Sequence, residues 1–241
     1  MIFYICDGTP ENFFTAVFDA YNTSECMITS DKELQLSLGC ATVSVQTDLK
    51  KCERVRRGLK KYDKHAEEDI LAALRSFNTN KEQICFLYIK RLLAHKKPIR
   101  NAFSLPEVVD LDTILHQITY EIHRFTGFLR FKETANGTFY APYSPDNDIT
   151  DLLMPHFAAR FRAPFIIHDV KRKIAGLFNG NEWIMTYVGD AEICLSESER
   201  AFESLWKKYY KSVNIKERPH EKQMKGYMPV RYWKFLPEKN G

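Results

Sequence analysis

GFLRFKETANGTFYAPY, residues 127–143, decides the fold prediction, because two apolar and aromatic runs flank an Asn-Gly pair. Asn136 and Gly137 suit the positive φ angles of a two-residue hairpin turn. Such a turn predicts three cross-strand pairs: Thr134 with Phe139, Lys132 with Ala141, and Arg130 with Tyr143. The stretch is therefore predicted to be an antiparallel hairpin.

A second hairpin is predicted in KIAGLFNGNEWIMTY, residues 173–187. Its Asn179-Gly180 pair would place Gly176 opposite Trp183. FIIHDV, residues 165–170, reads as a further strand. A helix is expected over 146–161, capped by Asn147 or Asp148 and broken or restarted at Pro155.

The N-terminal half is predicted to be mostly helical. MIFYIC, residues 1–6, reads as a strand that precedes a helix capped by Thr9 and started by Pro10. TVSVQT, residues 42–47, alternates like a short strand, and residues 48–124 show helical periodicity. Helices and antiparallel strands segregate along the chain, so we predict an α+β fold in which the two hairpins form an antiparallel sheet. We divide the chain into 1–114 and 115–241, expected to form one compact unit.

Composition excludes several classes of protein. The six cysteines are scattered without a close pair, which fits a reduced protein and gives no zinc framework. The start lacks the basic region of a signal peptide and no apolar run approaches a membrane span, so we expect a cytoplasmic protein without a membrane partner. Phosphate-loop, dinucleotide, HExxH, nucleophile-elbow and deaminase motifs are absent, as is a cysteine trio for an iron–sulfur cluster. We therefore expect no cofactor.

Positive charge gathers in two stretches. Residues 48–64 hold eight Lys or Arg against three acids, on what reads as one helix. KSVNIKERPHEKQMKGYMPVRYWKFLPE, residues 211–238, holds seven against three, with aromatic residues among them. Rings that stack on bases and cations that meet phosphates are what single-strand binding needs. The alternative is that the helix face is only solvated and that the arm only completes the fold, with Trp233 and Phe235 covering the core.

Several side chains are candidates for catalysis. His168 and Asp169 end a strand and are followed by Arg172, a setting suited to proton transfer or phosphate contact. His156 and Arg160 lie one helical turn apart, so Arg160 could clamp an anion. The alternative is that these residues serve the fold. No metal is expected; the one alternative would gather three histidines, His123, His156 and His168.

Six blocks in order resemble an uncharacterised bacterial family linked to DNA metabolism: ITYEIHRFTGFLRF, FYAPYSPDNDI, PHFAARF, IIHDVKR, KSVNIKER and MPVRYWKFLPE. The resemblance is strongest from about residue 115 to the end. The matching positions proposed for nucleic-acid or anion binding are Arg130, Tyr140, Arg160, Arg172, Lys211, Asn214, Arg218, Gln223, Arg231, Tyr232 and Trp233. Members often carry an Arg-Asn pair before the tail glutamine, where this chain has Arg218-Pro219-His220.

The resemblance implies genes beside a radical-SAM protein and, in some proteins, fusion to a family-4-type uracil-DNA glycosylase. We therefore expect an accessory protein of DNA metabolism or repair that binds DNA or a DNA-bound partner, with such proteins as its partners. One alternative is an enzyme on a nucleotide or nucleic acid, with His168, Asp169 and His156 as catalytic groups and arginines as clamps. Another is a module that binds only proteins.

Overall fold

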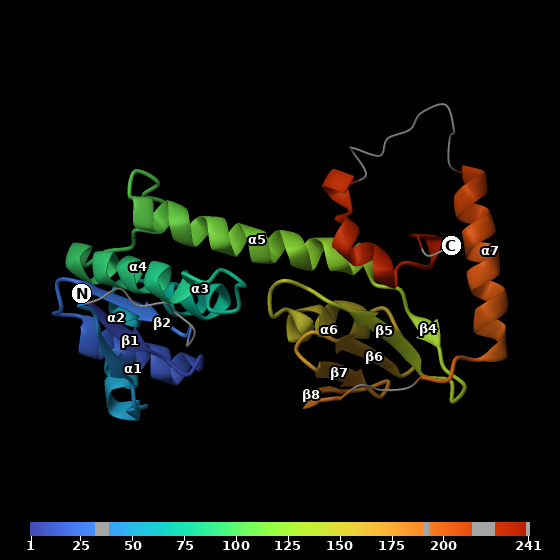
Figure 1. Ribbon diagram of the computed structural model, residues 1–241, viewed down its shortest axis with the longest axis horizontal. Helices are drawn as coiled ribbons and strands as arrows, with labels where there is room; N and C mark the ends of the chain where they lie inside the picture. Colours follow the sequence, from blue (N-terminus) through green and yellow to red (C-terminus); the bar gives the residue numbers. More distant parts are fainter. Residues whose placement is uncertain (32–38, 190–192, 214–224, 240–241) are drawn as a thin grey trace. The chain divides into compact units, whose positions relative to one another are not determined.

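A computed structural model describes residues 1–31, 39–189, 193–213 and 225–239 of the 241-residue chain. The chain forms two compact units, Met1–Thr119 and Tyr120–Gly241, and each is described by itself. Helices and strands occur in both units, so the α+β class is confirmed (Figure 1). The prediction of an antiparallel sheet is wrong in detail, because the first unit has a parallel sheet and the second a mixed one.

The first unit is built on a three-stranded parallel sheet with the order β2-β1-β3. The strands are β1 (Ile2–Ile5), β2 (Cys26–Thr29) and β3 (Ala41–Ser44). Parallel neighbours need a crossover, and α1 (Pro10–Ala20) provides the one between β1 and β2. Thr9 caps α1 as predicted, because its hydroxyl accepts the Asn12 amide at 3.4 Å. The short strand β2 was not predicted, since CMIT is too brief to show an alternating pattern.

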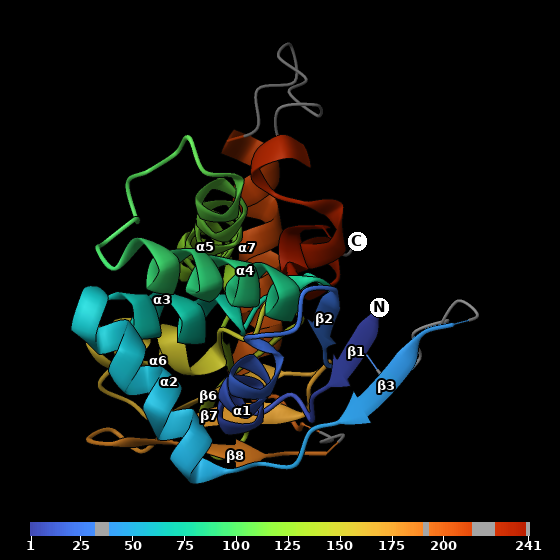
Figure 2. The same cartoon turned by 90° about the vertical axis from the view of Figure 1, so that its left-hand side faces the viewer.

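Helices make up the rest of the first unit and confirm the prediction for residues 48–124. They are α2 (Leu49–Tyr62), α3 (Ala66–Ala73), α4 (Lys81–His95) and the first part of α5 (Pro106–Phe128). Figure 2 shows these helices gathered to one side of the strands. The Gln83 side chain on α4 accepts the Ile28 amide at 2.9 Å, which fixes α4 beside the edge strand β2.

The second unit has a five-stranded sheet with the order β4-β5-β6-β7-β8. Its strands are β4 (Lys132–Glu133), β5 (Phe139–Tyr143), β6 (Phe165–Asp169), β7 (Ile174–Phe178) and β8 (Trp183–Tyr187). β5 and β6 are parallel and are joined by α6 (Thr150–Ala158), whereas the other neighbours are antiparallel. Helix α6 lies so close to β7 that a Cβ atom at Gly176 would overlap the sulfur of Met154.

Both predicted hairpins are present, but both predicted registers are wrong. In the first, Lys132 pairs with Tyr140, because the loop has three residues instead of two. The Asn136 side chain accepts the Thr138 amide at 3.2 Å, and Gly137 takes a φ of 77°. A three-residue loop with a left-handed last residue is the next most common hairpin connection.

In the second hairpin Phe178, not Gly176, pairs with Trp183, and the Asn179 amide donates to the Glu182 carbonyl at 3.1 Å. The two-residue loop is therefore Gly180-Asn181, one residue later than predicted, and the Asn179 side chain accepts the amides of Asn181 and Glu182, each at 2.9 Å. In both loops an asparagine side chain replaces a backbone partner, which an Asn-Gly pair alone does not reveal.

Two predictions about the helix after β5 are also wrong. The helix runs through Pro155 to Ala158 without a break, and its N-cap is Ile149, which makes no side-chain capping bond. The Asn147 side-chain amide donates to Glu121 at 2.7 Å.

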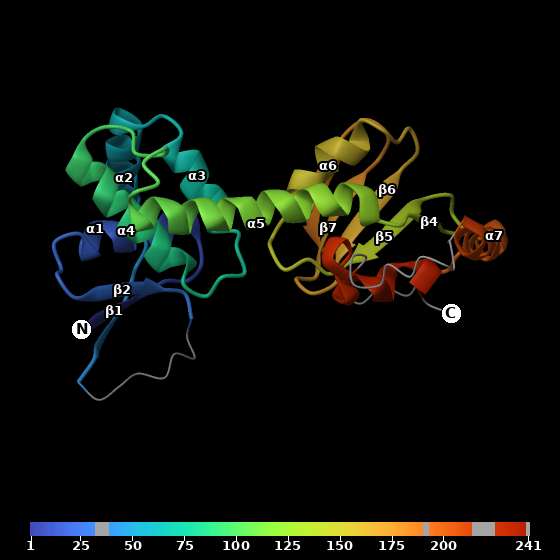
Figure 3. The same ribbon diagram turned by 90° about the horizontal axis from the view of Figure 1, so that it is seen from above.

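The chain ends with α7 (Glu197–Val213) and two short 3-10 helices, η1 (Val230–Phe235) and η2 (Pro237–Lys239). The start of α7 has half of a capping box, because Ser196 accepts the Glu199 amide at 3.2 Å. The Glu199 side chain accepts the Glu133 amide at 2.9 Å instead of the Ser196 amide. Figure 3 shows η1 and η2 between the end of α5 and α7. Among the described residues, no helix combines the length and apolar character needed to span a bilayer.

Candidate nucleic-acid interface

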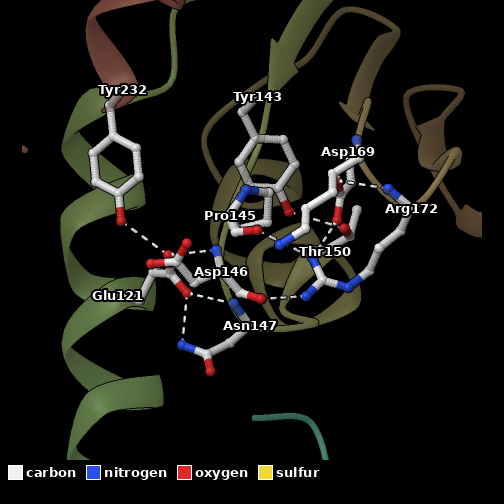
Figure 4. Close-up of polar contacts among 10 residues, drawn as sticks. Glu121, Tyr143, Pro145, Asp146, Asn147, Thr150, Asp169, Arg172 and Tyr232 are labelled. Atoms are coloured by element: carbon white, nitrogen blue, oxygen red, sulfur yellow. Dashed lines mark hydrogen bonds and ion pairs between the residues drawn. The ribbon is translucent and has the colours of Figure 1, made fainter. Parts of the chain in front are cut away.

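The described part of the C-terminal arm, residues 225–239, is anchored to the end of α5 by a buried carboxylate. Glu121 is 4% exposed and stands in the apolar stripe of α5 that also contains Ile118 and Phe125. The Tyr232 hydroxyl donates to Glu121 Oε1 at 2.8 Å (Figure 4). Burial and then the charge of Glu121 raise the pKa of Tyr232, so its phenol stays protonated and donating. Tyr232 thus fastens η1 to α5.

The same carboxylate holds the loop that follows β5. Glu121 accepts the backbone amides of Asp146 and Asn147, each at 2.9 Å, and the Asn147 side-chain amide at 2.7 Å. A buried carboxylate with four donors is well satisfied, which is the condition for burying such a charge. Glu121 therefore joins three segments: α5, the loop at 146–147 and the arm.

A second buried carboxylate anchors the end of the arm. The Glu238 side chain is 2% exposed; it accepts from Arg130 at 2.8 Å and from Trp206 Nε1 at 3.0 Å. Burial alone would raise its pKa, but the hydrogen bonds from Arg130 and Trp206 and the charge of Arg130 outweigh it, so the pKa lies below its usual value. Arg130 is thus occupied within the fold.

The outer side of the arm is different, and we call it the arm face: Tyr120, Arg124, Tyr227, Arg231 and Lys234. Tyr120 is 48% exposed, Tyr227 63%, and Lys234 is also exposed. The Arg124 guanidinium lies 4.2 Å from the centre of the Tyr120 ring and donates to the Gly226 carbonyl at 3.0 Å. These contacts place the exposed Tyr120 ring and the half-buried Arg124 beside Gly226, next to Tyr227, while Arg231 and Lys234 lie one turn apart on η1.

Arg231 belongs to both the anchor and the arm face. It donates to the Tyr232 hydroxyl at 3.1 Å and pairs with Asp146 at 2.5 Å, yet half of its side chain is exposed (51%). An exposed ion pair contributes only about 0–1 kcal/mol. A phosphate can therefore compete with Asp146 for this guanidinium.

The basic stretch at residues 48–64 differs from the arm face, because several of its cations are paired within the first unit. On α2, Lys51 pairs with Asp19 at 2.7 Å, and Lys60 pairs with Glu67 at 3.1 Å. Arg56 also binds Glu67. The α2 face thus combines charge with internal ion pairs, and the rings beside its cations, Phe18 and Tyr62, are half-buried.

The predicted catalytic pair at the end of β6 has a different setting for each residue. His168 is 4% exposed and its Nδ1 lies 2.7 Å from the Tyr140 hydroxyl. Asp169 is fully buried; it pairs with Arg172 at 2.8 Å and accepts the Lys171 and Arg172 amides. Arg172 further donates to the carbonyls of residues 145 and 146. The loop after β5 is thus held twice: by Glu121, which precedes it in the chain, and by Asp169 and Arg172, which follow it.

The remaining candidates differ in their exposure. His123 is exposed on α5, and His156 is half-buried on α6 against Phe157. Arg160 is exposed just beyond α6. In the described ranges, no three His, Cys, Asp or Glu residues are grouped as a metal would require, so the histidine trio is not assembled.

Some predicted arm residues cannot be placed. Asn214, Arg218 and Gln223 lie outside the described residues, as does the side chain of Lys211. Trp233 is half-buried: its Nε1 donates to the Met228 carbonyl at 3.1 Å, and the Lys239 ammonium lies 4.9 Å from its ring centre. Trp233 therefore makes contacts within the arm, and its ring is only partly exposed.

The anchors themselves were missed by the sequence reasoning. A signal for Glu121 existed, because a carboxylate stands where the helical period of α5 requires an apolar residue. Glu238 and Trp206 gave no such signal, since they are distant in sequence from Arg130 and meet it only in the fold.

Residues 79–238 match the family described as a domain of unknown function, DUF4130, and the chain belongs to that family. The match covers the second unit's sheet, α7 and the arm, together with α4 and α5 of the helical half. No curated protein matches the chain.

Proposed function

We propose that the second unit binds single-stranded nucleic acid along the arm face, as an accessory protein of DNA metabolism. One observation carries the proposal: the arm is fixed by its buried residues while its rings and cations stay outside. Tyr232 and Leu236 are 2% and 1% exposed, whereas Tyr227 is 63% exposed. A surface held rigid in this way loses little entropy when a strand binds.

The chemistry of the face fits single strands better than duplexes. Tyr120 and Tyr227 offer rings on which unpaired bases can stack, and Arg124, Arg231 and Lys234 offer charges to phosphates. Bases in a duplex are already stacked on each other and present no free faces. Single strands are therefore expected to bind more tightly than duplexes of the same sequence.

A direct binding titration tests the proposal. A fluorescent single-stranded oligonucleotide of about 20 nucleotides and its duplex are titrated with the full chain at low and moderate salt. Tyr227→Ala is expected to weaken single-strand binding by about 1–3 kcal/mol. Val230→Ala, which removes a 53% exposed apolar neighbour, is the matched control and should leave it unchanged. Absence of salt-sensitive binding to either nucleic acid would remove the proposal.

A partner enzyme is part of the proposal, because the resemblance implies a radical-SAM protein encoded beside the gene. Helix α7 exposes Phe202, Leu205 and Tyr209, at 62%, 62% and 57%, with helical spacing. An exposed apolar stripe of this kind is suited to a partner helix. The radical-SAM protein that the resemblance implies is the partner to test, by co-purification with the wild-type chain and with a Leu205→Glu, Tyr209→Glu variant.

A further inference from the structure

A pocket of about 360 Å³ lies within the second unit, between the end of α5, β4, α7 and η2. Its lining includes Arg130, Phe131, Lys132, Phe202, Glu203 and Trp206. Sites for small molecules are commonly about 300–1,000 Å³ and combine apolar walls with a few polar groups. We call this cavity the α7 pocket; the function proposed above does not use it.

Aromatic rings dominate the walls of the α7 pocket. Phe202 is 62% exposed, and Phe131 and Trp206 are half-buried. Trp206 is held in place by its hydrogen bond to Glu238 at 3.0 Å, and the Arg130 guanidinium lies 5.7 Å from the centre of its ring. A planar, electron-rich ring system is the ligand best matched to such walls.

The polar groups of the α7 pocket add a requirement for hydrogen bonds. Arg130 donates to Glu238 and to the Gly127 carbonyl, but its buried Nε–H has no acceptor among the described residues. A buried donor in this state needs an acceptor from a ligand or water. Glu203, paired with Lys132 at 2.5 Å and 26% exposed, can accept from a ligand amino group. The ligand should thus be flat and carry both hydrogen-bond donors and hydrogen-bond acceptors on its edge.

The α7 pocket also adjoins the arm. Pro237 of η2 lines it, and the Lys239 ammonium lies 5.0 Å from the Tyr210 ring of α7 and 4.9 Å from the Trp233 ring of η1. The views in Figures 1 and 3 agree in placing η1 and η2 between α5 and α7. The end of the arm therefore borders the α7 pocket.

We propose that the α7 pocket binds one nucleobase of the single strand that the arm face holds. The inference rests on the proposed function and deepens it, because it assigns the place where a base leaves the strand. The base stacks on Phe202 at the entrance and donates from an amino group to the Glu203 carboxylate. An aromatic side chain of a protein partner is the competing occupant.

The test uses an oligonucleotide that contains one 2-aminopurine, a base whose fluorescence falls when it stacks. Wild type is expected to quench it on binding. Phe202→Ala should bind about tenfold more weakly and lose the quenching, whereas Phe202→Tyr should retain both. Ser204→Ala, exposed on α7 but outside the pocket lining and outside the apolar stripe, is the control and should behave as wild type.

Each outcome is decisive. Salt-sensitive binding by wild type with unchanged affinity and quenching in Phe202→Ala overturns the pocket and leaves the proposed function standing. Weaker binding by Phe202→Ala without any quenching in wild type also overturns it, because the ring would then contact something other than a base. No binding by wild type removes the proposed function together with the pocket.

Discussion

Two arginines contact Asp146 from different regions of the second unit, the turn after β6 and the C-terminal arm. Arg172 donates to the Asp146 carbonyl and pairs with the fully buried Asp169, so only a quarter of its side chain is exposed (25%). Arg231 pairs with the Asp146 carboxylate, and half of its side chain is exposed (51%). The different environments of the two arginines separate the structural role of Arg172 from the binding role proposed for Arg231, although both positions matched the same family resemblance.

The largest effect is expected where both regions meet, at Glu121. Glu121→Ala removes the acceptor of the Tyr232 hydroxyl and of three donors from the loop at 146–147. Leaving these buried donors unsatisfied should lower the free energy of unfolding by about 3 kcal/mol. Urea denaturation measures this, with Glu182→Ala in the exposed β7–β8 loop as control. A loss below about 1 kcal/mol would show that the anchor is dispensable.

The next largest effect is a loss of stability at Arg172, which distinguishes this arginine from Arg231. Arg172→Ala leaves the Asp169 carboxylate buried without its partner and should cost about 2 kcal/mol of stability. Nucleic-acid binding by the folded fraction should keep the salt dependence of wild type. Lys171→Ala, an exposed neighbour, is the control for stability. A reduced salt dependence in Arg172→Ala would place Arg172 in the interface after all.

A smaller and pH-dependent effect is expected at the second anchor. Because the folded-state pKa of Glu238 is lowered, its charge contributes stability above the unfolded-state pKa of about 4.3, and this stability is lost as pH falls through the folded-state value. Wild type should exceed Glu238→Gln in stability by about 1 kcal/mol near pH 7.

The advantage of wild type over Glu238→Gln should shrink as the pH falls below the unfolded-state pKa of about 4.3, because the carboxyl of the unfolded chain is then protonated first, and it should vanish once the folded-state carboxyl is protonated as well. Denaturation curves at about pH 7, 5 and 3.5 measure the trend. An advantage that grows as the pH falls would contradict the assigned ion pair with Arg130.

Local features of the fold were predictable, and its long-range contacts were not. Thr9 and Pro10 predicted the start of α1, and the two Asn-Gly pairs predicted the hairpins, because these signals act within a few residues. The hairpin registers failed because side chains such as Asn136 reshaped the loops. The parallel pairing of β1 with β2 depends on a crossover and on tertiary contacts that no short stretch encodes.

The candidate site followed the same division. The basic-aromatic composition of the arm was visible in the sequence, which also led us to expect an ordered arm. Which residues point inward was not, because Tyr232 meets Glu121 across 111 positions of the chain. In the alternative that the arm only completes the fold, Trp233 and Phe235 would cover the core; they are half-buried, and Tyr232 and Leu236 are the buried residues of this segment.

The most direct measurement is the salt dependence of single-strand binding by wild type and by Arg231→Ala, Lys234→Ala. Each phosphate contact on a single strand contributes about 0.7 to the slope of log K against log salt. The double variant should therefore lose about 1.4 from the slope while its unfolding free energy changes by less than about 1 kcal/mol. An unchanged slope, with wild-type affinity, would contradict the account and assign the arm to the fold alone.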